Sequence, residues 1–521
     1  MTKSLHKKVG IASMIMMSSV LLSRVIGVFR EMVIAYIGGA TLEVDAYQVA
    51  FVIPEILNHI VASGFLSVTF IPIFTAYITQ NDEEAGWRVF SLILTCVGSL
   101  LLLFIFLSFL FAPQVIDLVA PGRNDPVFKA IAVRMTRIII PAQFFFFAGG
   151  LFMAVQFAKE RFLVPALAPL LYNLGIVAGG LFMGTRIGME GFSWGVLTGA
   201  FVGNFLLQCW AASRVGMRFR FTFDFRHPDL RKYIFLTLPL MLGLTMIFSM
   251  EIFIRYFGSY LSNGNIAALN YGRTILLIPV GLFGQAVGVA SFPFMARLIA
   301  ENKVQEMNQL LNRALRYLAL VIPFSVLLMV LRHEVVQLLF QRGRFDTAAT
   351  ELTAGILMFL LPGAFALSAY TVVVRGYYAM QNTFFPAVFG TVAVSLSLPI
   401  YWYGMQWFEA QGIALAISLS GFFQVLLLYI LWNRKTGNKE SLIVYHFYIK
   451  IIVMSSLLGI FLEALKRKVF PFMDSPDLLR SAVVFLVIGG MYTLLIIGAG
   501  YLGKVQEIND VLARMIRKRP G

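Results

Sequence analysis

Long apolar runs separated by short polar segments dominate the pattern of hydrophobic positions along this chain. A helix that crosses a membrane needs about 20 predominantly apolar residues. Fourteen runs approach or exceed that length, and the longest predict helices that tilt or bend. The runs cover residues 10–38, 46–79, 88–112, 129–158, 162–184, 190–212, 232–260, 265–296, 313–331, 350–379, 384–404, 412–432, 444–465 and 479–503. The pattern therefore predicts an all-α polytopic membrane protein with about 14 transmembrane helices.

Prolines and glycines, which punctuate helices, recur along the chain at one fixed offset of 221 residues. The recurring pairs are Pro72 and Pro293, Gly122 and Gly343, Pro141 and Pro362, Pro165-Ala166 and Pro386-Ala387, and Gly191 and Gly412. The offset predicts two lobes of six helices each. Because six is an even number, both lobes enter the membrane from the same side and are related by a pseudo-two-fold axis along the membrane normal.

This repeat divides the chain into four predicted parts. An N-lobe with helices 1–6 occupies residues 1–212, and a cytoplasmic linker follows at 213–231. A C-lobe with helices 7–12 occupies residues 232–432, and residues 433–521 hold two extra helices, 13 and 14, and a basic C-terminal tail. Residues 298–312 are expected to form a surface amphipathic helix that links the lobes, with Met307, Leu310 and Leu311 on its apolar side.

The composition supports a membrane protein and argues against a nucleic-acid partner, a disulfide framework and a metal site. The chain is 59% hydrophobic and 13% charged, whereas soluble domains carry roughly 25% charged residues. Its net charge of +16 would suggest nucleic acid in a soluble protein, but here most Lys and Arg residues lie in short loops between apolar runs. No nucleic-acid partner is therefore expected. Two cysteines inside apolar runs and five scattered histidines predict neither a disulfide framework nor a metal site.

The basic loops also predict an orientation. Basic residues are concentrated in the N-terminal tail, after helices 6, 8 and 12, and in the C-terminal tail, and these segments all fall on one side of the predicted topology. The positive-inside rule assigns that side, with both termini, to the cytoplasm. The loops at 332–346 and 466–468 are exceptions, because they place basic residues on the opposite side.

Charged side chains inside the apolar runs are the candidate functional groups, because a charge at membrane depth is costly. On the first helix Arg24, Gly27 and Glu31 share one face, with Arg30 on its flank. Asp45 and Glu55 belong to the second helix, Glu251 and Arg255 to the seventh, and Arg273 to the eighth. These leading helices of the two lobes are expected to line a central, arginine-rich cavity. A guanidinium group stays charged and binds phosphate oxygens through two parallel hydrogen bonds, which favours a phosphate or pyrophosphate ligand.

Structural explanations compete with this interpretation. Arg24 and Arg30 can form buried salt bridges with Glu31 or Asp45, or extend to an interface. Glu251 and Arg255 can neutralise each other across one helical turn. Arg134 and Arg137 lie near the end of a predicted helix, where their side chains can extend to the membrane surface.

Enzymatic motifs do not occur in the sequence. It contains no Walker loop, no dinucleotide fingerprint, no G-x-S-x-G elbow and no carboxylate cluster for a metal, so no cofactor is expected. The chemistry favours a transporter rather than an enzyme. Transport would be passive or driven by an ion gradient, with a monovalent ion as a candidate partner, or by the membrane potential.

Several strings of the sequence form a recognisable set, in this order: residues 23–31 (SRVIGVFRE), 45–54 (DAYQVAFVIP), 70–72 (FIP), 278–284 (IPVGLFG), 339–345 (LFQRGRF) and 375–383 (RGYYAMQNT). Together they resemble the MurJ/MviN family of the MOP exporter superfamily. The resemblance covers nearly the whole chain and implies a fourteen-helix flippase in the bacterial cytoplasmic (inner) membrane. Its cargo would be lipid II, the undecaprenyl-pyrophosphate-linked peptidoglycan precursor, moved to the periplasmic leaflet by alternating access. The resemblance also implies that Arg24 and Arg30 contact the pyrophosphate, that Asp45 matches a functionally important acid, and that helices 13 and 14 form a groove for the polyprenyl tail.

The resemblance extends the candidate site and leaves the cargo open. Substrate-binding candidates are Arg24, Arg30, Glu31, Asp45, Arg255 and Arg273, and hinge candidates are Gly27, Pro54, Pro279 and Gly284. The chain departs from the family pattern at Asn58, His59, Ser63, Arg273 and Leu277. These departures keep open a flippase for another polyprenyl-pyrophosphate-linked saccharide. Two rivals remain beside it: a cation-coupled drug or solute exporter of the same superfamily, which predicts a cavity dominated by carboxylates, and a non-transporting scaffold for envelope synthesis.

Overall fold

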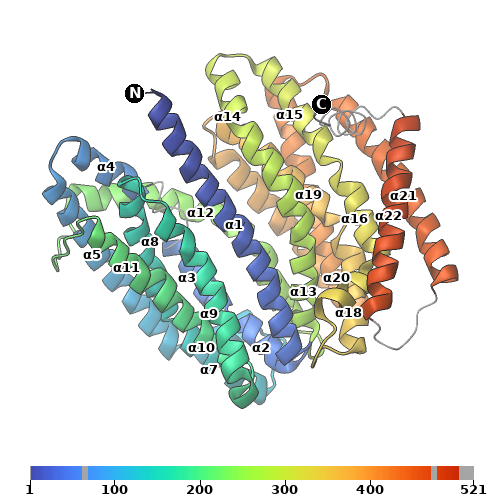
Figure 1. Ribbon diagram of the computed structural model, residues 1–521, viewed down its shortest axis with the longest axis horizontal. Helices are drawn as coiled ribbons and strands as arrows, with labels where there is room; N and C mark the ends of the chain where they lie inside the picture. Colours follow the sequence, from blue (N-terminus) through green and yellow to red (C-terminus); the bar gives the residue numbers. More distant parts are fainter. Residues whose placement is uncertain (1, 62–68, 471–477, 504–521) are drawn as a thin grey trace. The chain divides into compact units, whose positions relative to one another are not determined.

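Helices account for all the regular secondary structure in the part of the chain that the structure describes. The computed structural model describes residues 2–61, 69–470 and 478–503. Within them, ten helices are long and apolar enough to cross a membrane, and eleven are if the bent pair Thr347–Leu360 and Gly363–Ala379 is one span (Figure 1). One of the ten, Phe384–Thr436, contains two consecutive helices (below). The fold is therefore the all-α, polytopic membrane architecture that the sequence predicts.

The chain divides into two compact units, Met1–Ala267 and Ala268–Gly521. The helix Pro228–Gly258, which the repeat assigns to the C-lobe, groups with the first unit. Unit 1 contains α1 (Thr2–Gly38), α2 (Leu42–Ala50), α3 (Val52–Val61), α4 (Ile71–Thr79), α5 (Glu83–Leu110), α6 (Ala112–Val119), α7 (Pro126–Ile139), α8 (Ala142–Ala158), α9 (Leu163–Ile187), α10 (Glu190–Gly199), η2 (Ala200–Leu206), α11 (Leu207–Arg214) and α12 (Pro228–Gly258).

Unit 2 begins within the first turn of α13 and contains the remaining helices. They are α13 (Asn265–Pro279), η3 (Val280–Gln285), α14 (Ala286–Ala300), α15 (Val304–Leu318), α16 (Val321–Val330), α17 (Arg332–Phe340), α18 (Thr347–Leu360), α19 (Gly363–Ala379), α20 (Phe384–Thr436), α21 (Ser441–Val469) and α22 (Leu478–Leu502). The elements η2 and η3 are π-helical segments, one in each unit.

The internal repeat is visible in matching helices of the two units. α7 and α18 each have 14 residues, and α8 and α19 each have 17. Pro141 and Pro362 form one of the recurring pairs, and they lie directly before α8 and α19. The starts of α7 and α18 are also capped alike. Asp125 accepts a hydrogen bond of 2.8 Å from the Val127 N–H, and Asp346 accepts one of 2.8 Å from the Ala349 N–H.

Glycines bring the backbones of α9 and α10 into contact. A Cβ atom added at Gly179 would lie 2.4 Å from the Gly191 carbonyl oxygen, and one added at Gly175 would lie 2.5 Å from the Gly199 Cα. Such close approach, favoured by small residues in membrane helices, explains why α9 and α10 run side by side in Figure 1.

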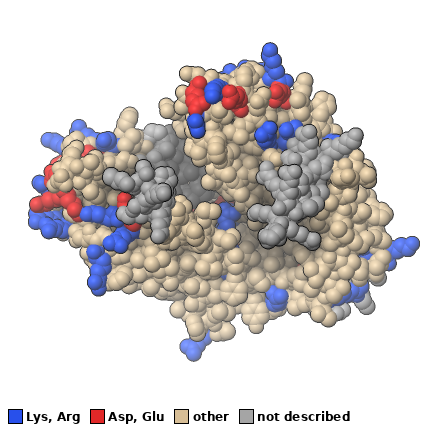
Figure 2. Space-filling model, turned by 45° about the horizontal axis from the view of Figure 1, so that its top comes forward, with Lys and Arg blue, Asp and Glu red and all other residues tan. Residues whose placement is uncertain are grey.

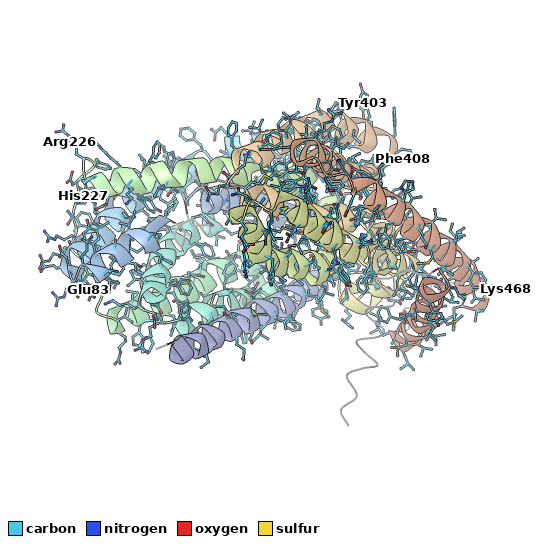
Figure 3. The ribbon with its side chains drawn as sticks, turned by 90° about the horizontal axis from the view of Figure 1, so that it is seen from above. Glu83, Arg226, His227, Tyr403, Phe408 and Lys468 are labelled. Carbon is cyan, nitrogen blue, oxygen red and sulfur yellow. The ribbon has the colours of Figure 1, made fainter. Side chains whose placement is uncertain are left out.

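A similar contact folds α20 back on itself. Glu409 has a φ of +50°, outside the helical range, and divides the element into the two helices predicted at 384–404 and 412–432. A Cβ atom added at Gly412 would lie 1.8 Å from the Gly404 carbonyl oxygen. The two helices are therefore the arms of a hairpin, and Tyr403 and Phe408, labelled in Figure 3, lie at its tip.

The prediction of one amphipathic helix at 298–312 is wrong in its boundaries. α14 continues to Ala300, a turn follows, and α15 begins at Val304 and continues to Leu318. Met307 and Leu311 are buried, as an apolar face requires, and Leu310 is partly buried. The segment lies inside unit 2, between two of its helices, so it does not link the two repeats.

Charge and apolar surface are distributed as a membrane protein requires. In Figure 2, acidic and basic side chains gather in patches and leave most of the visible face without charge. Glu83, Arg226 and His227 lie together at one end of unit 1 in Figure 3. Many large apolar side chains are exposed, including Phe106 on α5 at 58%, Phe182 on α9 at 79% and Leu486 on α22 at 71%. Exposed apolar area on this scale marks a lipid-facing surface.

Candidate substrate-binding site

A cluster of charged side chains in unit 1 gathers several of the predicted site residues. On α1, Arg30 donates from Nε and Nη2 to Glu31 Oε1, at 3.2 and 2.7 Å. Its Nη1 donates to Asn173 Oδ1 on α9, at 3.0 Å. The Arg30 side chain is 28% exposed and the Glu31 side chain 7%. The predicted pairing of Arg30 with Glu31 is therefore present, while part of the guanidinium remains accessible.

Polar neighbours from other helices surround Arg30. Tyr47 on α2 and Tyr172 on α9 lie near enough to interact with it electrostatically. Asn173 is held in place because its Nδ2 donates to the Pro169 carbonyl at 2.9 Å and to Ser23 Oγ at 3.3 Å. The sequence analysis missed Asn173 and Tyr172, because polar uncharged side chains within an apolar run give no strong signal.

Arg255 pairs with Glu55 and not with the neighbour that the sequence suggests. Its Nη1 and Nη2 donate to Glu55 Oε2 and Oε1 at 2.5 and 3.1 Å, in the bidentate geometry that arginine and carboxylate favour. The Arg255 side chain is only 6% exposed. Glu251, one turn earlier on α12, makes other interactions. The expected neutralisation is therefore present, with α3 rather than α12 supplying the carboxylate.

Asp45 is enclosed by hydrogen-bond donors. It is fully buried and accepts from the backbone N–H groups of Gly264, at 2.7 Å, and Ala267, at 2.8 Å. Arg123 approaches the same carboxylate, with Nη2 at 3.3 Å from Oδ2, and also donates to the Ser262 carbonyl at 3.3 Å. The carboxylate thus joins three segments of unit 1. Arg123 was not predicted, although Gly122-Arg123 recurs as Gly343-Arg344 at the repeat offset.

Arg24 differs from the other arginines of the cluster. It is exposed on α1, and no described residue forms a hydrogen bond or ion pair with it. Six residues of unit 1 form the three pairs just described, Arg30–Glu31, Arg255–Glu55 and Arg123–Asp45. Arg24 is therefore the one of these four arginines that stands outside the three pairs. A Cβ atom added at Gly27, between Arg24 and Arg30, would meet no atom within 4 Å.

Three of the four predicted hinge residues occupy breaks or close contacts, whereas Gly27 lies inside the continuous helix α1 without a close contact. Pro54 is buried in the first turn of α3, directly after the break between α2 and α3. Pro279 ends α13, where the π-helical segment η3 begins. A Cβ atom at Gly284 would lie 2.9 Å from the Ser368 Cα of α19, so this glycine permits close helix packing. Their role as hinges stays a prediction.

Arg273 and Leu277 belong to α13 in unit 2, whereas the cluster described above belongs to unit 1. Arg273 is half-buried and Leu277 is exposed. The side chains of Asn58, His59 and Ser63, where the chain departs from the family pattern, lie outside the described residues. Among the side chains that are described, no group of three or more His, Cys, Asp and Glu residues lies close enough together to hold a metal ion.

Two units of repeated apolar helices, with buried arginine–carboxylate pairs in the first, define a polytopic membrane transporter fold. A sequence model of the family described as "Lipid II flippase MurJ" matches residues 34–475, which is most of the chain. The chain therefore belongs to this family, as the sequence strings indicate.

Relatives and solved structures agree with this family. A protein named probable lipid II flippase MurJ from Thermotoga maritima is 27% identical and covers 94% of this chain and 96% of its own. A protein of the same name from Buchnera aphidicola subsp. Baizongia pistaciae is 26% identical, over 92% of this chain and 93% of its own length.

Solved structures share the fold. The structure of a lipid II flippase MurJ in an inward closed conformation matches with a TM-score of 0.76 and 22% identity, over 94% of this chain and 99% of that chain. An inward-facing multidrug resistance MATE family transporter of the MOP superfamily matches with a TM-score of 0.67 and 13% identity, over 80% of this chain and 94% of that chain. The fold is thus shared with the MOP superfamily.

Proposed function

We propose that this protein moves lipid II, a polyprenyl-pyrophosphate-linked peptidoglycan precursor, between the leaflets of the bacterial cytoplasmic membrane by alternating access. Membership of the MurJ family supports the cargo. The observation in the structure that carries the proposal is the excess of positive charge on α1. Arg24 has no described partner, and Arg30 keeps part of its guanidinium exposed beside Glu31.

The chemistry of the cluster suits a pyrophosphate. A diphosphate offers several anionic oxygens, and Arg24 can bind one phosphate without first breaking an ion pair. Arg30 can bind the other while Asn173 holds its guanidinium in place. Glu31 would then lose part of its pairing with Arg30, so that binding and local rearrangement are coupled. In this proposal Asp45, Arg255 and Glu55 shape the site and do not bind cargo, because their polar atoms already have partners.

Both ends of the chain are proposed to lie in the cytoplasm. The supporting observation is the concentration of basic residues in the terminal tails and in the segment between α11 and α12, which follows the positive-inside rule. Arg226 and His227 mark this segment in Figure 3.

Complementation tests this proposal. A bacterial strain depleted of its own lipid II flippase would express the full chain, the variants Arg24→Ala, Arg30→Ala and Arg30→Lys, and the control Arg226→Ala. Arg226 is exposed in the segment that precedes α12, at the end of unit 1 where Figure 3 also labels Glu83. We expect the unaltered chain and the control to restore growth. The alanine variants should fail at equal membrane levels, and Arg30→Lys should restore growth in part because a point charge cannot reproduce the bidentate geometry.

Two results would contradict the proposal in different ways. Full growth with Arg24→Ala and Arg30→Ala would reject the site. Failure of the unaltered chain, combined with rescue of a mutant that lacks an O-antigen flippase, would reject lipid II as cargo and favour another polyprenyl-pyrophosphate-linked saccharide.

A further inference from the structure

A groove on unit 1, separate from the arginine cluster, contains two arginines that the proposed function does not use. It has a volume of about 660 Å³. It is formed by α7, α10 and the end of α5, and its lining residues are Phe109, Ala130, Val133, Arg134, Arg137, Ile138, Pro141, Trp194 and Leu197. Apart from the two arginines, the lining is apolar or aromatic. Phe109 and Trp194 are each 41% exposed, so the groove has an aromatic rim.

The two arginines are positioned differently. The Arg137 guanidinium lies 5.1 Å from the centre of the Phe109 ring, and its Nε donates to the Phe109 carbonyl at 3.1 Å. No described residue accepts a hydrogen bond from its two Nη groups, so their N–H groups are available to a ligand. Arg134, one turn earlier on α7, is 60% exposed and pairs with Glu190 at 2.5 Å. Two cations and one carboxylate leave the groove with one excess positive charge.

The lengths of the helices place the groove near the edge of the apolar band of a membrane. α7 and α8 together form the 33-residue span Pro126–Ala158, about 13 residues longer than one crossing requires. If these extra residues are shared between both ends, the apolar band begins near Arg134, and Arg137 lies about one turn inside it, from where a long arginine side chain reaches the headgroups. Trp194, on the first turns of α10, fits the same level, because tryptophan is enriched at membrane interfaces.

We infer that this groove binds one anionic phospholipid, with its phosphodiester on Arg137 and Arg134 and an acyl chain along the apolar wall. Guanidinium groups match phosphate oxygens in geometry as well as in charge. The apolar lining selects a lipid over a free phosphate, since it offers an ion nothing to bind. The positive charge favours an anionic lipid over a zwitterionic one, whose ammonium group would meet the excess positive charge. In the orientation proposed above, the lipid belongs to the outer leaflet.

The neighbouring ion pair gives the proposal a directional consequence. Glu190 competes with a phosphate for Arg134, because both are anions and the Arg134–Glu190 contact is partly exposed. Removing the Glu190 charge should therefore strengthen lipid binding. Simple extension of the two arginines to the membrane surface predicts no such dependence on Glu190.

Lipid titration of the purified full chain tests the inference. The chain would be reconstituted in phosphatidylcholine nanodiscs doped with phosphatidylglycerol, and retained phosphatidylglycerol would be counted by native mass spectrometry. We expect one phosphatidylglycerol to be retained in preference to phosphatidylcholine. The double variant Arg134→Gln/Arg137→Gln should weaken its binding by about tenfold or more, because the loss of a single charge-assisted hydrogen bond already corresponds to about tenfold. Glu190→Gln should strengthen it.

A matched control comes from the opposite end of the same bundle. Arg214 stacks on Trp210 at 5.5 Å and thus repeats the arginine–aromatic pair of Arg137, but it lines no part of this groove. Arg214→Gln should leave the retained lipid unchanged. Equal retention of phosphatidylglycerol and phosphatidylcholine, or unchanged retention in the double variant, would overturn the inference. If the double variant does not fold, unchanged binding by Glu190→Gln would overturn it.

Discussion

At the scale of single residues, unit 1 pairs its buried charges almost completely. Three carboxylates, Glu31, Asp45 and Glu55, each lie within 3.3 Å of an arginine nitrogen. Burial removes water from these groups, so each pair depends on its partner far more than a surface pair does. Arg24, by contrast, is exposed and has no partner among the described residues, which is why the proposed function assigns cargo binding to it.

The pair formed by Glu55 and Arg255 gives a stability prediction. The Glu55→Leu change would leave the guanidinium of Arg255 buried without its carboxylate, and we expect a loss of about 3–5 kcal/mol in the free energy of unfolding. Unfolding in mild detergent, monitored by circular dichroism, measures this loss of stability.

The double variant Glu55→Leu/Arg255→Met is the control for this prediction. It removes both charges, so it should recover most of the lost stability. A single variant as stable as the unaltered chain would show that this pair contributes nothing to the fold.

At the scale of helices, the breaks are as informative as the spans. Pro141 and Pro362 stand at equivalent positions before α8 and α19, and π-helical segments interrupt helices in both units. In the hairpin of α20, by contrast, two glycines allow the backbones to touch. Each break therefore has a local cause in the sequence. Proline lacks a backbone N–H, a π-helical segment contains an extra residue, and glycine lacks a side chain.

The hairpin predicts a large effect of a very small substitution. In Gly412→Ala the new methyl group would overlap the Gly404 carbonyl, and the arms would have to separate. We expect a loss of about 1–3 kcal/mol, measured as a lower midpoint of thermal unfolding. Gly490→Ala on α22 is the control, because a Cβ atom there meets nothing within 4 Å. Equal midpoints for both variants would contradict the close contact.

The sequence was most informative about these elements and least informative about their partners. Apolar runs depend on local composition, so the spans could be predicted, and the repeat marked Pro141 and Pro362 correctly. The partner of Arg255 could not be predicted, because Glu251 is near in sequence whereas Glu55 is near only after folding. The same holds for Asp45, whose donors at Gly264 and Ala267 are more than 200 positions away.

At the scale of the whole molecule, a polar network attaches the last two helices to the rest of unit 2. Lys466 on α21 donates to the Val330 carbonyl at 2.5 Å and to Glu334 at 3.1 Å. Glu463 accepts from Arg332 at 3.2 Å, and Ser481 on α22 donates to Gln337 at 2.5 Å. Together these contacts fix α21 and α22 to α16 and α17. Lys468, labelled in Figure 3, marks this end of α21.

This network makes the stability of unit 2 dependent on pH. Burial, followed by the positive charges of Arg332 and Lys466, lowers the pKa of His333 from 6.5 to about 4. The unfolded chain therefore binds a proton at a higher pH than the folded one, and stability should fall as pH decreases from about 6.5 towards 4. Unfolding midpoints across this range, compared with those of His333→Gln, measure the effect. The variant should lose less stability on acidification, and identical pH profiles would contradict the assignment.

The backbone contact between α9 and α10 has a consequence for how the site can change shape. Helices that touch through glycine cannot slide past each other without a clash, so α9 and α10 behave as one rigid helix pair. Asn173 and Tyr172 extend from α9 of this pair toward Arg30. In the proposed pyrophosphate site, α9 and α10 thus form one rigid wall, and Asn173 already holds Arg30 of α1 against that wall at 3.0 Å.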